Sequence, residues 1–107
     1  MVGTPGRLVD HLYNTENFVY HNFCSLVIDE ADRMFDLGFE REMKKLLSKL
    51  SEVQPNHQTL LFSATDDARL QQFCRTAFQG RQPALINLQH GEMTVQQLEQ
   101  GYRARCL

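Results

Sequence analysis

The sequence predicts an α/β fold built on a parallel sheet, and two observations carry that prediction. Short apolar runs, each bounded by polar residues, recur at 25–29, 59–62 and 84–88. Segments with helical apolar periodicity separate these runs, which gives the order strand, helix, strand, helix, strand. This order is typical of βαβ units, whose parallel strands are joined by right-handed crossovers. An uninterrupted apolar run is expected of a parallel strand that is buried on both faces.

At the N-terminus we expect the end of a strand and then a helix. Residues 1–3 are short and apolar, like the tail of a strand whose start is missing. Thr4 is a good N-cap, and Pro5 suits the first helical position because its missing N–H would be unpaired there in any case. The helix should bury an apolar stripe made of Leu8, Val9, Leu12 and Tyr13. A polar and aromatic connection follows at 14–22.

The middle of the chain predicts a strand and two helices. The strand at 25–29 is followed by a short helical stretch at 31–35, which breaks near Gly38. Apolar residues then recur at i, i+4, i+7, i+8 and i+11, the pattern of an amphipathic helix. They are Phe39, Met43, Leu46, Leu47 and Leu50. Pro55 and Asn56 mark the next turn.

The last third predicts a strand, a helix and a further strand. After the run at 59–62, a helical stripe is formed by Leu70, Phe73, Cys74, Ala77 and Phe78. Gly80 is a plausible stop for that helix, and 84–88 is predicted as the third strand. From residue 89 the alternation of strand and helix patterns weakens. We therefore expect 1–88 to form part of one domain, and 89–107 to be a linker with the possible start of another unit.

Composition narrows the class of protein. The 107 residues are 42% hydrophobic and 22% charged, as in a globular chain, and the net charge of −2 makes bulk-charge binding to nucleic acid an unlikely role. Three separated cysteines without C-x-x-C spacing indicate a reduced intracellular protein, and the four scattered histidines do not suggest zinc. No apolar stretch approaches the roughly 20 residues that span a bilayer, so we expect a soluble protein without a membrane partner. Nucleus, nucleolus and cytoplasm are not distinguished.

Polar clusters follow two of the predicted strands. Asp29 and Glu30 come directly after the first run, and Ser63 and Thr65 after the second. Parallel strands end at one edge of a sheet, and open α/β sheets bind ligands there. If the strands are neighbours, the two clusters can hydrogen-bond to each other. An aspartate at the end of such a strand has the form of a Walker B element, whose Asp holds the magnesium ion of a bound nucleotide.

A third polar segment, Thr4-Pro5-Gly6-Arg7, opens the first predicted helix. A helix N-terminus presents free N–H groups and favours phosphate. Gly6 permits close approach of a ligand to the backbone, and Arg7 can form two hydrogen bonds with a phosphate. Such contacts are made to the phosphate backbone of a nucleic acid and carry no sequence information. Taken alone, however, Arg7 is an ordinary solvated charge.

These three segments, in this order, closely resemble the first RecA-like domain of DEAD-box RNA helicases. The middle segment, Asp29-Glu30-Ala31-Asp32, spells the family's name, and Ser63-Ala64-Thr65 fits its third motif. The resemblance runs from residue 2 to about 88. It implies a partial RecA-like parallel sheet with helices on both faces, a three-layer α/β/α fold. Residues 98–102 are weakly similar to the entry into the second helicase domain.

The resemblance implies a role for each residue. Asp29 would coordinate Mg²⁺ through water, and Glu30 would orient and deprotonate the water that attacks the γ-phosphate of ATP. Asp32 would hydrogen-bond to Ser63 or Thr65 and so link the ATP site to RNA; it is also a helix N-terminal charge favoured by the macrodipole. The RNA backbone would be contacted by Thr4, Gly6 and Arg7. The second RecA-like domain is a further expected partner.

One part of a nucleotide site is missing from these residues. A phosphate-binding loop needs G-x-x-x-x-G-K-[ST], and none of Lys44, Lys45 and Lys49 follows a glycine. We therefore interpret the chain as the C-terminal part of a first helicase domain plus linker, and expect it to be inactive alone. Open strand edges and uncovered apolar surface should make it marginally stable or prone to aggregate.

Two other functions remain open. The chain could be a short non-catalytic module that binds RNA or protein through its helicase-like surface. It could also belong to another P-loop ATPase with a similar Walker B element. The segments Thr4–Arg7 and Ser63–Thr65 argue against this last possibility.

Overall fold

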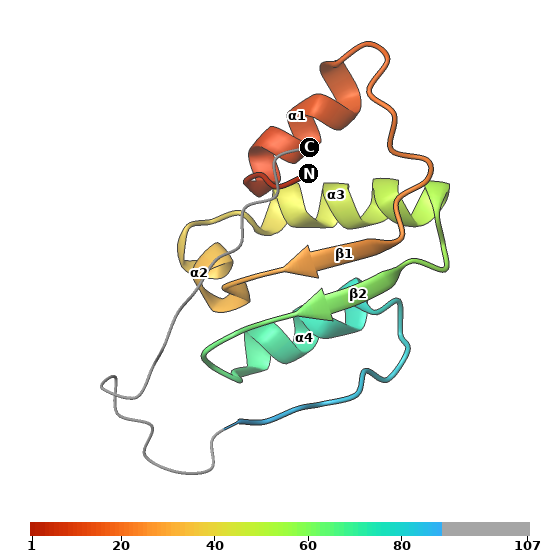
Figure 1. Ribbon diagram of the computed structural model, residues 1–107. Coiled ribbons are helices and arrows are strands. Elements are labelled where there is room, and N and C mark those ends of the chain that lie inside the picture. The colour runs from red at the N-terminus through yellow and green to blue at the C-terminus, as the bar shows by residue number, and fades with distance from the viewer. Residues whose placement is uncertain (89–107) are drawn as a thin grey trace, which may run out of the picture.

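A computed structural model of the chain describes residues 1–88; the predicted linker at 89–107 lies outside the described residues. The described residues form two strands and four helices (Figure 1). In order they are α1 (Pro5–Asn14), β1 (Ser25–Ile28), α2 (Ala31–Asp36), α3 (Glu40–Val53), β2 (Gln58–Leu61) and α4 (Ala68–Ala77). Each lies where apolar periodicity or an apolar run predicted it.

The two strands pair in parallel, which confirms the predicted βαβ unit. Ser25 lies opposite Gln58 and Ile28 opposite Leu61. Pairing continues beyond the strand ends, because the Phe62 N–H donates to the Ile28 carbonyl at 2.8 Å and the Ala31 N–H donates to the Phe62 carbonyl at 3.0 Å. These bonds fix the ends of both strands at a common edge, which is where the predicted site residues follow.

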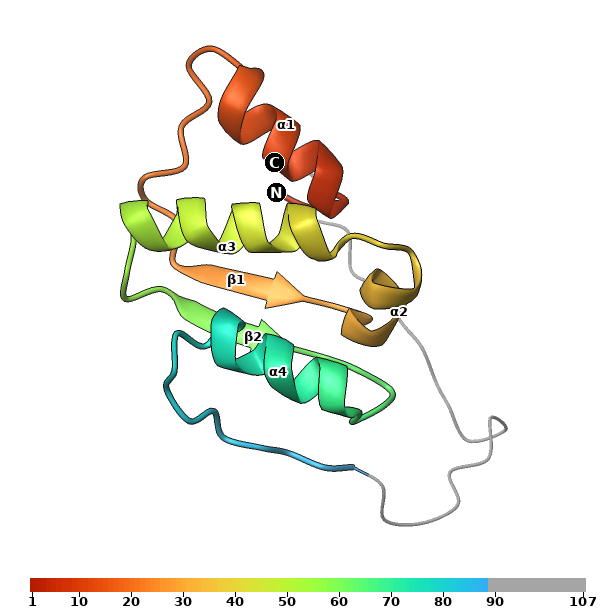
Figure 2. The ribbon, with the colours of Figure 1, turned by 180° about the vertical axis from the view of Figure 1, so that it is seen from behind.

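The core lies between this sheet and one layer of helices. Four residues of α3 are buried, and with residues of β1, α2 and α4 they form a single apolar cluster. Its buried members are Ile28, Ala31, Met43, Leu46, Leu47, Leu50, Leu70, Phe73 and Ala77. Figure 2 shows α3 and α4 next to each other over the strands. Burying one such leucine or phenylalanine side chain stabilises a fold by about 1.5–3 kcal/mol.

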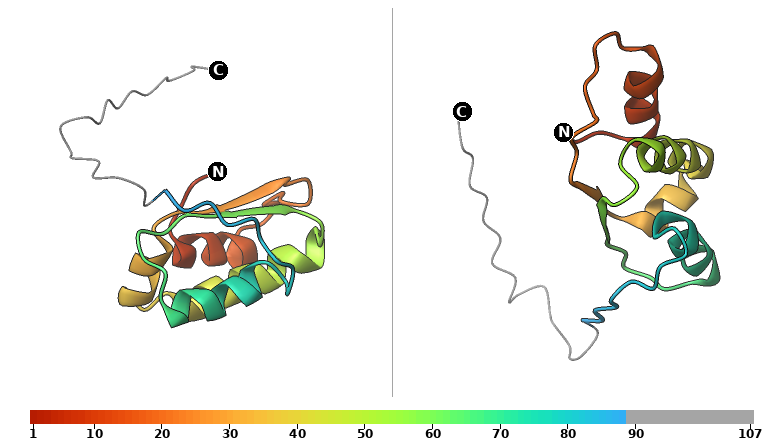
Figure 3. Two further views of the ribbon diagram at one scale, coloured as in Figure 1. Left: turned by 90° about the horizontal axis from the view of Figure 1, so that it is seen from below. Right: turned by 90° about the vertical axis from the view of Figure 1, so that its right-hand side faces the viewer.

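Helices α1, α3 and α4 all lie on the same face of the sheet (Figure 3). The strands alternate accordingly: Ile28 is 3% exposed, whereas its neighbour Val27 is 56% exposed on the other face. Leu60 of β2 is also exposed. The α/β class and the parallel sheet are therefore as predicted, but within residues 1–88 the expected second helical layer is not formed. Every described amphipathic stripe packs into the one core, which leaves no helix for the opposite face.

Two predicted strand segments are wrong. Residues 1–3 and 84–88 form no strand in the described part of the chain. Leu85, Ile86 and Leu88 are each more than four-fifths exposed. A strand requires a neighbouring strand for its N–H and C=O groups, and the sheet of the described residues contains only β1 and β2. Apolar sequence is thus insufficient to define these elements.

The helix ends follow their local sequence signals only in part. Gly80 does end α4: its φ is 73°, and its N–H donates to the Arg75 carbonyl at 2.9 Å. Thr4 occupies the N-cap of α1, but its side chain makes no capping hydrogen bond. Tyr13 is 58% exposed and so leaves the predicted apolar stripe. Among the described residues, no helix is long and apolar enough to cross a bilayer.

Candidate functional site

The two carboxylates that follow β1 are held at a sharp turn. Glu30 has φ 49° and ψ 49°, a left-handed conformation that residues other than glycine rarely adopt. Its N–H donates to Asp29 Oδ1 at 2.9 Å, and its position is the N-cap of α2. Such a backbone costs on the order of 1–3 kcal/mol and is found preferentially at functional sites. The turn leaves both side chains exposed at the edge of the sheet.

Glu30 and Asp29 differ in their partners. The Glu30 carboxylate forms an ion pair with Arg33, Oε2 to Nη1, at 3.2 Å. Both side chains are more than three-fifths exposed, so this pair is worth only about 0–1 kcal/mol and can open readily. Within residues 1–88 Asp29 makes no ion pair, which leaves carboxylate oxygen available to a cation.

The donor set fits a magnesium ion that brings its own water and phosphate ligands. Mg²⁺ is usually bound by one or two carboxylates together with substrate phosphates and several waters. Asp29 is such a carboxylate, exposed and without a competing lysine or arginine in the described residues. A cage of three or more histidine, cysteine, aspartate or glutamate side chains does not occur in that part of the chain. The predicted role of Asp29 is therefore compatible with the structure.

The predicted contact between the two polar clusters is present. Thr65 Oγ1 donates to Asp32 Oδ2 at 3.5 Å, and Ser63 Oγ accepts from the Thr65 N–H at 3.4 Å. Asp32 thus contacts Thr65, and Ser63 supports the loop. Both bonds are long and therefore weak. Ala31, next to Asp32, is fully buried and belongs to the core cluster.

A second contact between α2 and α4 was not predicted. Arg69 lies 3.5 Å from Asp36, and its guanidinium stands 5.8 Å from the centre of the Phe35 ring. Phe35 in turn meets Phe73 edge-to-face at 5.4 Å. The partners Asp36 and Arg69 are 33 residues apart, so no local spacing could have indicated the pair.

Asp67 is a missed residue that did have a sequence signal. Its side chain caps α4, accepting the Leu70 N–H at 2.8 Å. This hydrogen bond, with help from the charge of Arg69, holds the pKa of the Asp67 carboxyl below its usual value. An aspartate directly before an apolar helical stripe is a standard N-cap signal.

The first turn of α1 is open to a ligand. A Cβ added at Gly6 would meet no atom within 4 Å, so a ligand can approach the backbone closely there. Arg7 is exposed and lies 3.8 Å from Asp10, a contact weak enough to be exchanged for a phosphate. Thr4 is exposed as well. The three residues predicted to contact RNA are thus accessible.

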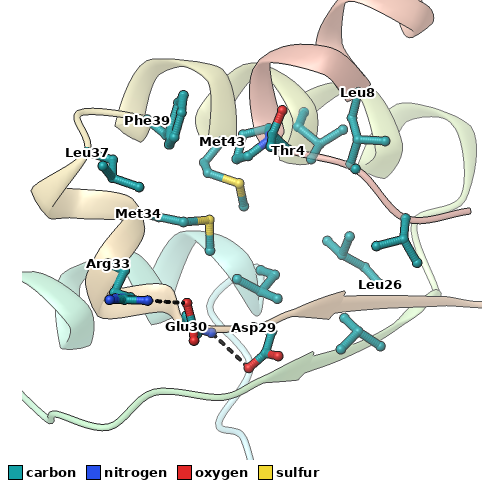
Figure 4. Close-up of a pocket in the computed structure, with 16 residues that line it drawn as sticks. Thr4, Leu8, Leu26, Asp29, Glu30, Arg33, Met34, Leu37, Phe39 and Met43 are labelled. Atoms are coloured by element: carbon teal, nitrogen blue, oxygen red, sulfur yellow. Dashed lines mark hydrogen bonds and ion pairs between the residues drawn. The ribbon is translucent and has the colours of Figure 1, made fainter. Parts of the chain in front are cut away.

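A cleft of about 290 Å³ separates this turn from the carboxylates. Thr4 stands on one lip, and Asp29 and Glu30 stand on the other, with Met34 and Met43 between them (Figure 4). The structure therefore gathers two of the three predicted segments around one cleft. The third, Ser63–Thr65, joins through Asp32.

Comparison with known proteins agrees with this arrangement. The profile of the family described as DEAD/DEAH box helicase matches residues 1–73. The chain is 47% identical over 104 residues to the ATP-dependent RNA helicase has1 of Schizosaccharomyces pombe, and 44% identical to HAS1 of Coccidioides immitis. Each match covers 95% of this chain. The chain spans 18% and 17% of the length of these relatives, respectively.

A solved structure is also similar. The chain matches the crystal structure of the yeast DEAD-box splicing factor Prp28 with a TM-score of 0.57 and 42% identity. The match covers 66% of this chain and 16% of that one. The described fold is accordingly that of part of a RecA-like domain.

Proposed function

The chain belongs to the DEAD/DEAH box helicase family, and from that premise we propose that it is part of an ATP-dependent RNA helicase, in which ATP hydrolysis drives local unwinding or remodelling of RNA. One observation carries the proposal. Asp29 and Glu30 follow β1 at the carboxyl edge of a parallel sheet, and Asp32 joins them to Thr65 of the neighbouring loop. That edge is where α/β sheets bind nucleotides.

In this proposal the two carboxylates have different tasks. Asp29 would hold a magnesium ion through water, and the bound ion would neutralise charge on the phosphates. Glu30 orients the attacking water and accepts its proton. Before it can do so, the Glu30 carboxylate must leave Arg33, and the weakness of that exposed pair supports this step.

The contacts to RNA and to the rest of the site are assigned in the same way. Thr4, Gly6 and Arg7 bind the phosphate backbone of RNA at the start of α1, without reading sequence. Asp32, Ser63 and Thr65 link the nucleotide edge to the RNA-responsive parts. The 3.5 Å contact between Asp32 and Thr65 supports a link that can break and re-form during a cycle.

We further propose that residues 1–88 are the C-terminal part of the first RecA-like domain, and 89–107 the linker and start of the second. The second RecA-like domain would then be a partner in the working enzyme. None of the 107 residues forms a G-x-x-x-x-G-K-[ST] loop, so nothing here cradles the β- and γ-phosphates. A chain of these residues alone should neither hydrolyse ATP nor unwind RNA.

The proposal is tested by supplying the missing loop. A chimera places the residues that flank the matched segment in the S. pombe relative on both sides of this chain. RNA-stimulated ATP hydrolysis by the chimera, together with its absence in the 107-residue chain, is the expected result. A folded chimera that binds ATP and RNA but never hydrolyses ATP would refute the proposal.

A non-catalytic interaction module is the second candidate. It is favoured by the accessible start of α1 combined with the lack of a phosphate loop in these residues. In that case the 107-residue chain binds single-stranded RNA by itself, independently of ATP and with strong salt dependence. Substituting Arg7→Gln would weaken this binding, whereas Arg75→Gln, on an exposed position of α4, would not.

A further inference from the structure

Two side-chain contacts join α2 to the segment that follows β2. Thr65 lies 3.5 Å from Asp32 at the start of α2, and Arg69 lies 3.5 Å from Asp36 at its end. We propose that Arg69 and Asp36 form a positioning pair, which holds the Ser63–Thr65 loop against α2 so that RNA can stimulate ATP hydrolysis. The pair rests on the proposed function and acts in it only through other residues.

The position of Thr65 depends on where α4 begins. Phe62, before the loop, is bound through its backbone to Ile28 and Ala31, whereas residues 63–66 belong to no helix or strand. The bond from Thr65 to Asp32 is long and therefore weak. In Figures 1 and 2, α2 lies beside the start of α4 at the end of the sheet where this loop turns. A contact between the two helices can therefore fix the far end of the loop.

Both charges of the pair stand at the helix end that disfavours them. Asp36 is the last residue of α2, and Arg69 is the second residue of α4. Helix dipoles favour anions at the N-terminus and cations at the C-terminus, so each charge opposes the dipole of its own helix. The opposite charge of the partner offsets this cost on both sides. The arrangement thus favours the paired state over two separately solvated side chains.

The Arg69 guanidinium is held from several directions. Its Nη2 faces Asp36, while its Nε lies 3.5 Å from Asp67, the cap of α4. The same group stands 5.8 Å from the centre of the Phe35 ring, and Phe35 meets Phe73 edge-to-face at 5.4 Å. A planar guanidinium can serve two carboxylates and a ring at once, whereas a lysine ammonium is a point charge. This requirement makes an arginine specifically suited to the position.

The first experiment uses the chimera with a phosphate loop and measures the ratio of RNA-stimulated to RNA-free ATP hydrolysis. Arg69→Gln and Asp36→Asn should each lower this ratio about two- to fivefold, the size of effect that an exposed ion pair allows. The double variant should be no worse than either single one, because both remove the same interaction. Arg69→Lys should lie between. Arg75→Gln, at an exposed position of α4, should leave the ratio unchanged.

Direct contact of Arg69 with RNA is the main alternative to a positioning role. The dissociation constant for single-stranded RNA distinguishes the two, because loss of a phosphate contact weakens binding and makes it less dependent on salt. For a positioning residue, Arg69→Gln should leave both the constant and its salt dependence as they are in the unmodified chimera.

The contact is also tested without enzymatic activity, which separates its failure from failure of the proposed function. NMR follows the Thr65 methyl group in the 107-residue chain, and in the chimera if the chain self-associates. Arg69→Gln and Asp36→Asn should shift this signal alike, and Arg75→Gln should not. Added salt should move the signal of the unmodified chain toward that of the variants, since salt screens an exposed pair. An inactive unmodified chimera would refute the proposed function, while these shifts would still report on the pair.

Four results would overturn the proposal. In an active chimera, they are an unchanged ratio in Arg69→Gln, a double variant whose loss is the product of the two single losses, and weaker RNA binding by Arg69→Gln with a reduced salt dependence. The fourth is a Thr65 methyl signal that neither Arg69→Gln nor Asp36→Asn moves, which would mean that the pair does not hold the loop.

Discussion

The two faces of the same pair of strands have opposite environments. On one face, Ile28 is 3% exposed beneath α3 and α4; on the other, its neighbour Val27 is 56% exposed, and Leu60 and Phe62 are exposed with it. Their apolar character is similar, so the sequence of a strand does not reveal which face is covered. The difference indicates that helices cover one face of the sheet in the described residues and leave the other face open. The polar site lies at the edge of this sheet.

The sharpest way to break this comparison is a pair of substitutions in adjacent positions of β1. Ile28→Ala should lower the free energy of unfolding by about 2–5 kcal/mol, because it leaves a cavity in the core. Val27→Thr keeps a β-branched side chain on the uncovered face and should change it by no more than about 0.5 kcal/mol. Urea denaturation followed by circular dichroism measures both. Equal effects would mean that the two faces are not distinct.

The uncovered face should also govern association. Replacing Val27 and Leu60 together by threonine removes apolar area that two copies can bury against each other. The concentration at which the chain self-associates should rise by about tenfold or more, since 1.4 kcal/mol corresponds to a factor of ten. Sedimentation velocity over a concentration series measures this. If the unmodified chain is a monomer that unfolds sharply and reversibly, the expected tendency to aggregate is contradicted.

On the covered face, the cap of α4 should contribute a smaller and pH-dependent stability. Asp67→Ala should lower the Tm by a few degrees through loss of the bond to the Leu70 N–H, whereas Asp66→Ala should not. The pKa of Asp67 is lowered in the folded chain, chiefly by that bond. Its stabilisation is therefore present above the unfolded pKa and disappears as the pH falls through the folded pKa. The two Tm values should converge at low pH; a constant difference would contradict the capping role.

The smallest expected effect is a difference in reactivity between two cysteine thiols. Cys74 lies on α4, partly covered, and burial raises its thiol pKa, with a further contribution from the charge of Asp66. Cys24 is exposed just before β1. In a Cys106→Ser chain, iodoacetamide should modify Cys74 about tenfold more slowly than Cys24, because the thiolate is the reactive form. Mass spectrometry of the two peptides gives the rates, and faster modification of Cys74 would mean that α4 does not cover it.

The periodicity of the sequence predicted the helices and strands that depend on residues close together in the chain. Helical stripes located α1, α3 and α4, and apolar runs located both strands, because each such pattern reflects burial of one local surface. A contact between the two polar clusters was predicted as well, since parallel strands end at a common edge, and the family resemblance named Asp32 with Ser63 or Thr65. The prediction could name two acceptable partners for Asp32, and only the folded loop selects Thr65.

What could not be predicted depends on residues far apart or on a partner strand. The apolar run at 84–88 has the local properties of a strand, yet among the described residues the sheet consists of β1 and β2 alone. Arg69 of α4 meets Asp36 of α2, which is 33 residues away in the sequence, and no spacing rule anticipates such a pair. Similarly, Val27 and Ile28 are chemically alike, and their different burial is set by where the helices pack.

The most direct test concerns Glu30 itself. In the chimera with a phosphate loop, RNA-stimulated ATP hydrolysis is compared between Glu30→Gln and Glu40→Gln, an exposed glutamate at the start of α3. Loss of a proton acceptor of this kind typically costs 10²–10⁴-fold, so we expect Glu30→Gln to lower kcat by at least about a hundredfold with ATP binding retained, and Glu40→Gln to change little. Equal activity of the two variants would show that Glu30 is not the catalytic base.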